Sequence, residues 1–137
     1  MFATACIATI AVAILHTIGN TLGDAPSDSA YAALDAAMRG YRLPLGMGMS
    51  PSVYDIYRTL VFTMSISIAA MGVLGLVVAA SRDATFALIA QIATVEALAS
   101  AALTVLSAIY QVPPPLISFT VVTLLFAGAL MIARNAA

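Results

Sequence analysis

Four ionisable side chains interrupt apolar segments that are long enough to cross a bilayer: His16, Asp55, Arg58 and Glu96. Charges are costly inside a membrane, so such residues normally face a partner, the interior of a helix bundle or a watery cavity. Counting helical rises from the ends of the segments places His16 and Glu96 at a common depth of about 20 Å, with Arg58 nearer the boundary. A carboxyl group at that depth is expected to be protonated or paired with His16.

Polar neutral residues accompany these four at helical spacing. Asn20 follows His16 by one turn, Ser100 follows Glu96 by one turn, and Ser67 falls at a similar depth in its own segment. Hydroxyl and amide groups can hydrogen-bond a ligand or a neighbouring helix. The candidate ligand-binding residues are therefore His16, Asn20, Asp55, Arg58, Ser67, Glu96 and Ser100.

Each of the ionisable residues also has a structural interpretation. His16 and Asn20 can hydrogen-bond across helices. Asp55 can be the acid of a helix start, paired at i+3 with Arg58. Glu96 is the hardest to explain without a function, because a buried carboxyl must stay protonated or be paired.

The sequence assigns no catalytic residue, no metal site and no cofactor. It lacks the spacing of a zinc site, a GxSxG element and a Gly-rich phosphate loop. The single cysteine, Cys6, has no partner for an internal disulfide and is expected to be a small buried residue. Met47 and Met49 lie between glycines with no His or Cys nearby, and we expect them to fill packing gaps rather than to bind a soft metal.

Composition indicates an integral membrane protein. Of 137 residues, 63% are hydrophobic and 8% are charged, against about 25% charged in ordinary soluble domains. The net charge of −1 provides no electrostatic footprint for nucleic acid. Arginine without lysine in an alanine-rich chain is typical of a GC-rich bacterial genome.

The elements that must position these residues are four predicted spans in a single all-α membrane domain covering residues 1–137. A span needs about 20 apolar residues, and the matching runs are 2–22, 53–80, 85–110 and 116–133. The first run lacks the basic region of a signal peptide, and Pro26 blocks the plausible cleavage after Ala25, so we expect it to be retained. Gly19 and Gly23 form a GxxxG pattern that favours close helix packing.

The one long connection predicts a short amphipathic helix over residues 28–39. Tyr31, Leu34 and Met38 fall on one face, while Asp35 and Arg39 are spaced for an i,i+4 pair. This pattern is typical of a helix that lies on the membrane or caps a bundle. The SxxD sequence at 52–55 predicts a capping box that opens the second span.

An even number of spans puts both termini on one side of the membrane. Arg82 and Arg134 directly follow spans, so the positive-inside rule favours a bacterial inner-membrane protein with cytoplasmic termini.

The order of these features resembles small, uncharacterised bacterial four-helix membrane proteins of DoxX-like size and layout. The resemblance rests on His16 two-thirds along the first span, the amphipathic connection, SxxD at 52–55 and PPP at 113–115. More distantly, the chain resembles emopamil-binding-type sterol isomerases and sterol-binding proteins. That likeness implies a lipid-facing cavity holding an acid and a histidine, here Glu96 and His16.

Three functions remain open at this level. The first is binding, with or without conversion, of a lipophilic small molecule (quinone, isoprenoid or sterol-like) by His16 and Glu96. The second is an accessory subunit that packs against a larger membrane protein complex through small-residue faces. The third is a transporter or proton-relay element, which requires a homo-oligomer because one four-helix chain is too small.

The four-span topology predicts a definite labelling pattern. On a Cys6-free background, single cysteines at positions 36 and 112 should react with an impermeant thiol reagent from one side of the membrane. Cysteines at 82 and 136 should react from the other side. Labelling of 36 and 82 from the same side would contradict four spans.

Overall fold

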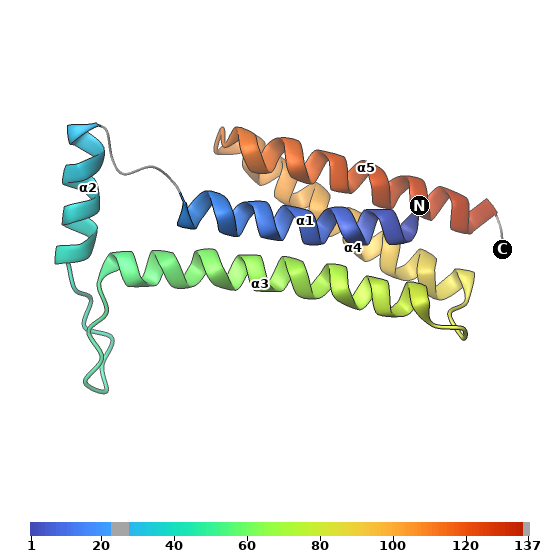
Figure 1. The fold of residues 1–137 in the computed structure, drawn as a ribbon, viewed down its shortest axis with the longest axis horizontal. Coiled ribbons are helices and arrows are strands. Elements are labelled where there is room, and N and C mark those ends of the chain that lie inside the picture. The colour runs from blue at the N-terminus through green and yellow to red at the C-terminus, as the bar shows by residue number, and fades with distance from the viewer. Residues whose placement is uncertain (23–27, 136–137) are drawn as a thin grey trace. The chain divides into compact units, whose positions relative to one another are not determined.

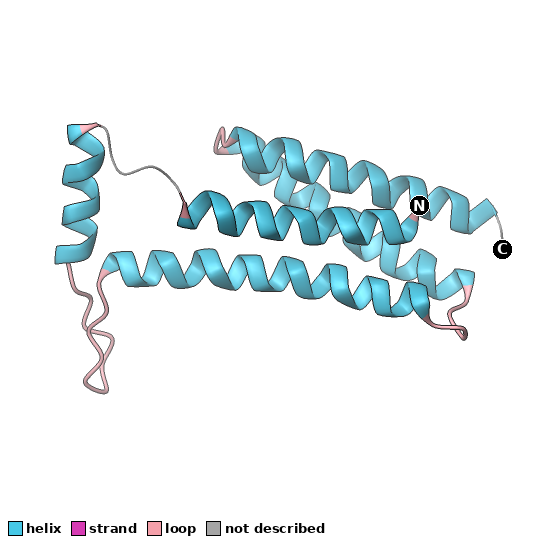
Figure 2. Cartoon of the chain, viewed as in Figure 1, coloured by secondary structure: helices cyan, strands magenta, loops and turns pink. Residues whose placement is uncertain are grey.

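The computed structural model describes residues 1–22 and 28–135, and every regular element in them is a helix (Figures 1 and 2). The helices are α1 (Phe2–Thr21), α2 (Ser29–Gly40), α3 (Val53–Ala80), α4 (Phe86–Ile109) and α5 (Pro113–Asn135). All except α2 are long and apolar enough to cross a membrane. The predicted all-α fold with four membrane helices and a short helix in the first connection is confirmed. Gly23, Ala25 and Pro26 lie outside the described residues, so the expectation that the first span is retained stays a prediction.

The predicted span limits agree closely with the helices except at the start of α5, which begins three residues before the predicted Leu116. The reason is the chemistry of proline. The first backbone N–H groups of a helix have no intrahelical partner, so a residue without an N–H fits there at no cost. Pro113, Pro114 and Pro115 take these positions, and the Leu116 N–H then donates to the carbonyl of Val112 at 3.2 Å.

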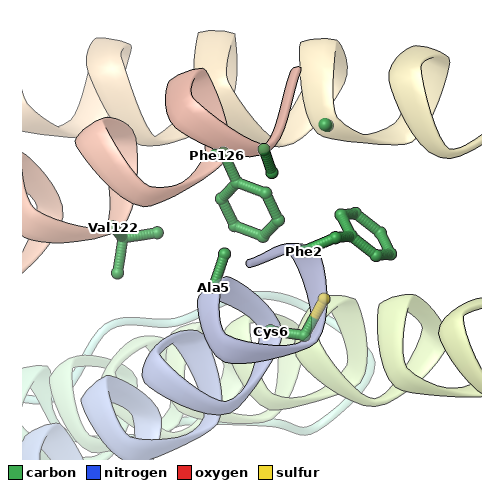
Figure 3. Packing of buried hydrophobic residues seen from close by; sticks show 7 residues of the cluster. Phe2, Ala5, Cys6, Val122 and Phe126 are labelled. Carbon is green, nitrogen blue, oxygen red and sulfur yellow. The ribbon is translucent and has the colours of Figure 1, made fainter. Parts of the chain in front are cut away.

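The chain divides into two compact units: residues 1–14 with 67–137, and residues 15–66. The first unit holds the beginning of α1, the end of α3, and all of α4 and α5. Its core is a cluster of buried side chains from α1, α4 and α5, which includes an edge-to-face pair of Phe2 and Phe126 with ring centroids 6.0 Å apart (Figure 3). Leu76 of α3 packs against this cluster.

Glycines let the beginning of α1 approach the end of α3 with backbones in contact. A Cβ atom at Gly72 would lie 2.8 Å from the carbonyl oxygen of Cys6 and 2.7 Å from a side-chain carbon of Ile10, and one at Gly75 would overlap the Cys6 sulfur. Cys6, only 1% exposed, fills the space that Gly75 leaves, as expected of a small buried residue. The close approach predicted at Gly19 is wrong, because nothing lies within 4 Å of the position of its missing Cβ.

In the second unit, α2 follows the predicted amphipathic pattern. Asp28 caps its start by accepting a hydrogen bond from the Ala30 N–H at 2.9 Å. The predicted pair forms, with Arg39 Nε 2.7 Å from Asp35 Oδ2. Figure 1 shows α2 running across the axis of α3 rather than along it, which is the orientation expected of a surface helix beside a span.

Residues 41–52 form a small hairpin, here called the finger, that the sequence did not predict. Isolated bridges pair Arg42 with Ser52 and Gly46 with Met49. Its tip runs through three consecutive left-handed residues, with φ of 83° at Gly46, 51° at Met47 and 76° at Gly48. Met47 is 91% exposed and Met49 is also exposed, so the expectation that they fill packing gaps is wrong.

The contact at Gly72 predicts a sharp difference between two Gly→Ala substitutions. Gly72→Ala should lower the free energy of unfolding by about 1–3 kcal/mol through overpacking. Gly19→Ala, with open space around it, should be neutral or stabilising by up to about 1 kcal/mol through helix propensity. Unfolding in detergent micelles, followed by circular dichroism, measures both, and equal stabilities would contradict the close contact.

Candidate functional site

Polar side chains on the C-terminal part of α1 and the N-terminal part of α3 form one connected network in the second unit. His16 Nδ1 lies 2.9 Å from Ser65 Oγ, and Ser65 is only 5% exposed. Asn20 Nδ2 donates to the His16 carbonyl at 2.7 Å, and Asn20 Oδ1 accepts from the Tyr57 hydroxyl at 3.3 Å. The structure thus brings His16 and Asn20 together as predicted, with Ser65 and Tyr57 as partners that the sequence analysis missed.

Arg58 joins this network by capping α1. Its Nη1 donates to the backbone carbonyl of Asn20 at 2.9 Å, and its guanidinium carbon lies 4.8 Å from the ring centroid of Phe62. Helix C-termini carry unpaired carbonyls and partial negative charge, so a cation is favourable there. The predicted pair of Arg58 with Asp55 does not form within the described residues.

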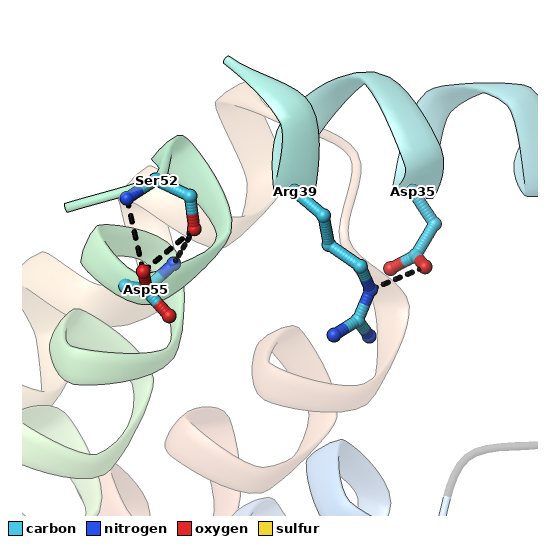
Figure 4. A network of polar contacts seen from close by, with 4 residues as sticks. All are labelled: Asp35, Arg39, Ser52 and Asp55. Carbon is cyan, nitrogen blue, oxygen red and sulfur yellow. Dashed lines mark hydrogen bonds and ion pairs between the residues drawn. The ribbon is translucent and has the colours of Figure 1, made fainter. Parts of the chain in front are cut away.

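Asp55 instead closes the capping box of α3. Its Oδ2 accepts from the Ser52 backbone N–H at 2.9 Å and from the Ser52 hydroxyl at 2.7 Å, while its own N–H donates to Ser52 Oγ at 3.1 Å (Figure 4). All of these bonds hold the start of α3, which confirms the predicted capping box. They assign Asp55 a structural role and leave it outside the polar network.

Glu96 is the chain's only glutamate and lies in the first unit, on the buried face of α4. Its residue exposure is 9%, and no hydrogen bond or ion pair reaches its carboxyl group from the described residues of that unit. No fully buried side-chain oxygen among the described residues lacks a partner. The Glu96 oxygens therefore retain a small accessible surface, with room beside them for another atom.

Ser100 and Thr123 extend this polar region from α4 to α5. Ser100 donates to the backbone carbonyl of Glu96 at 2.7 Å, and the Thr123 hydroxyl lies 2.9 Å from Ser100 Oγ. Thr123 was missed because scattered hydroxyl residues in an apolar run carry no distinctive pattern. Ser67, predicted to belong to the polar layer, is exposed on α3, and the buried hydroxyl of that stretch is Ser65.

No protein-family model, curated protein or solved structure matches this chain. Residue roles therefore come from the chemistry of the two polar regions. His16 and Glu96 belong to different units, and their pairing stays a prediction. His16 and Ser65 form a histidine–hydroxyl contact, and no group of three metal-ligating residues occurs in the described ranges. Hydrogen bonding is the chemistry that both regions offer.

The capping role of Arg58 predicts a stability difference between two arginine substitutions. Arg58→Gln should lower the free energy of unfolding by about 1 kcal/mol, because a half-buried carbonyl loses its charged donor. Arg42→Gln is the matched control, since Arg42 also donates to a backbone carbonyl, that of Ser50, but at an exposed site. Denaturation in micelles would rank them, and a control at least as damaging would argue against the cap.

Proposed function

We propose that this protein binds a lipophilic small molecule through Glu96 in the interior of its membrane helices. The observation that carries the proposal is a nearly buried carboxyl group to which the described residues of its own unit supply no partner. Leaving a buried polar group without a hydrogen bond costs about 2–7 kcal/mol, so native proteins satisfy such groups. Water is scarce inside a bilayer, and a ligand is a suitable replacement partner.

The chemistry of the ligand follows from the state of the carboxyl. Desolvation disfavours a charge, so a buried carboxyl with no cation beside it holds its proton. A protonated Glu96 offers one O–H donor and one carbonyl acceptor. The matching ligand carries a carbonyl or hydroxyl group on an apolar body, as quinones, isoprenoid alcohols and sterols do. Such a molecule reaches the site from the lipid phase.

The proposal places the protein in a bacterial inner membrane with cytoplasmic termini. Arg82 and Arg134 support this orientation, because they lie directly after α3 and within the last turn of α5. A lipophilic ligand dissolved in that membrane would need no aqueous entrance.

Extraction and mass spectrometry of the purified protein test this function. Wild type should carry a lipophile that is depleted about tenfold in Glu96→Ala, the loss expected for one hydrogen bond of about 1.4 kcal/mol. Glu96→Gln should retain it within severalfold, because an amide also donates and accepts. Gln91→Ala changes an exposed polar residue of the same helix and should have no effect.

Size-exclusion profiles would establish that each variant is folded. An undiminished lipophile in Glu96→Ala would contradict the proposed function. Stoichiometric foreign subunits without any lipophile would contradict it as well, and would favour the accessory-subunit alternative.

A further inference from the structure

A groove separates α2 from the first turns of α3. It has a volume of about 230 Å³ and is lined by Tyr31, Leu34, Asp35, Met38, Tyr54 and Tyr57. Ordinary small-molecule pockets measure about 300–1,000 Å³, so this one suits a small group rather than a whole drug-sized ligand. Tyrosine dominates the lining, and its ring offers an apolar face and a hydroxyl to a molecule at a polar–apolar boundary.

An acid–base pair stands beside this groove: Asp35 lines it, and Arg39 contacts the lining residues Asp35 and Tyr54. Arg39 uses Nε for Asp35 Oδ2, and its guanidinium carbon lies 3.6 Å from the centroid of the Tyr54 ring. Among the described residues, no hydrogen bond reaches Asp35 Oδ1. A side-chain hydrogen bond also joins Arg39 to Tyr54, and the guanidinium has further N–H donors on its two terminal nitrogens. In Figure 4 these nitrogens point away from the contact with Asp35. The pair therefore presents one free acceptor and a guanidinium with more N–H donors than its two side-chain partners use.

The Arg39 guanidinium of this pair is always positively charged. The hydrogen bond with Asp35 raises the pKa of Arg39 above its ordinary value, and the neighbouring Tyr54 adds to the effect. An arginine is already protonated throughout the physiological range. A fixed positive charge thus stands next to the Asp35 carboxylate that lines the groove.

The finger indicates that this end of the unit meets lipid. No charged residue occurs from Leu43 to Tyr54, and the exposed large hydrophobic residues of the tip are Leu45, Met47 and Met49. Tyr31 and Leu34 on α2 are also exposed. Exposed apolar side chains and tyrosines gather where a protein meets the headgroup region of a bilayer. Lipid molecules are therefore adjacent to the groove and can bind in it.

We propose that the groove binds the headgroup of a zwitterionic aminophospholipid. The phosphate accepts hydrogen bonds from the terminal nitrogens of Arg39, which are suited to two-point contact with phosphate oxygens. The ammonium group meets Asp35 Oδ1 and the faces of the tyrosine rings. The glycerol region packs on Leu34 and Met38. A zwitterion complements both charges of the pair, whereas an anionic lipid without an ammonium group leaves Asp35 opposed by like charge.

Native mass spectrometry of the full chain in detergent, titrated with single lipids, tests the site. Phosphatidylethanolamine should bind wild type more tightly than phosphatidylglycerol. Arg39→Gln and Asp35→Asn should each weaken phosphatidylethanolamine binding by about fivefold to tenfold, the loss of one charge-assisted contact. Asp35→Asn should not weaken phosphatidylglycerol binding. The controls Arg82→Gln and Asp83→Asn make the same charge changes in the turn after α3 and should leave the affinities unchanged.

Several results would overturn this inference. Equal affinity for the two lipids, or equal effects of the site and control variants, would show that the groove does not bind zwitterionic headgroups selectively. Competition by soluble phosphoethanolamine at the same concentration as the lipid would show that the ligand comes from water. A partly exposed ion pair contributes little to stability, and size-exclusion profiles of the variants check that each is folded. The site is independent of Glu96, and Glu96→Ala should leave it intact.

Discussion

Inside a bilayer a polar side chain has no water to bond with, and every such group on a span must find its partner in the protein or in a ligand. Most hydroxyls of these helices solve the problem locally by donating to the carbonyl four residues earlier. Residues that do so include Thr9, Thr94, Thr104, Ser107 and Thr120. Longer-range bonds add His16 to Ser65 and Thr123 to Ser100. Glu96 departs from this pattern, because no side chain in the described part of its own unit bonds the carboxyl.

The bilayer also determines how the helices pack against one another. Lipid tails are as apolar as leucine, so burying apolar side chains adds little free energy to helix association. The helices associate through close van der Waals contact instead. Small residues supply that contact where α1 meets α3, with Cys6 seated against Gly75. Gly128 of α5 receives the side chain of Met1 in the same way. Glycines therefore set the distance between the helices that carry the polar residues near this core.

The sequence was enough to predict the helices, because run length, prolines and caps act locally. It also predicted the Asp35–Arg39 pair and the Ser52–Asp55 capping box, whose spacings lie within one helical turn. Predictions that depended on a tertiary contact were less accurate. Which glycine lies at a helix crossing, or whether Ser65 or Ser67 turns inward, depends on helix rotation, and the weak amphipathicity of an apolar span does not encode it. The finger was missed because its backbone geometry rests on hydrogen bonds between residues ten apart, such as the Arg42–Ser52 bridge.

The central claim is that Glu96 is a protonated carboxyl that hydrogen-bonds a lipophilic ligand. Because the chain contains a single glutamate, carbon-13 glutamate labelling reports on this residue without mutation. Infrared spectra of the labelled protein in bilayers at neutral pH should show an isotope-shifted carboxylic-acid C=O band. That band should move to higher frequency when the lipophile is removed with detergent, because its hydrogen bond is lost. A carboxylate band alone, or an acid band indifferent to removal of the lipophile, would contradict the account.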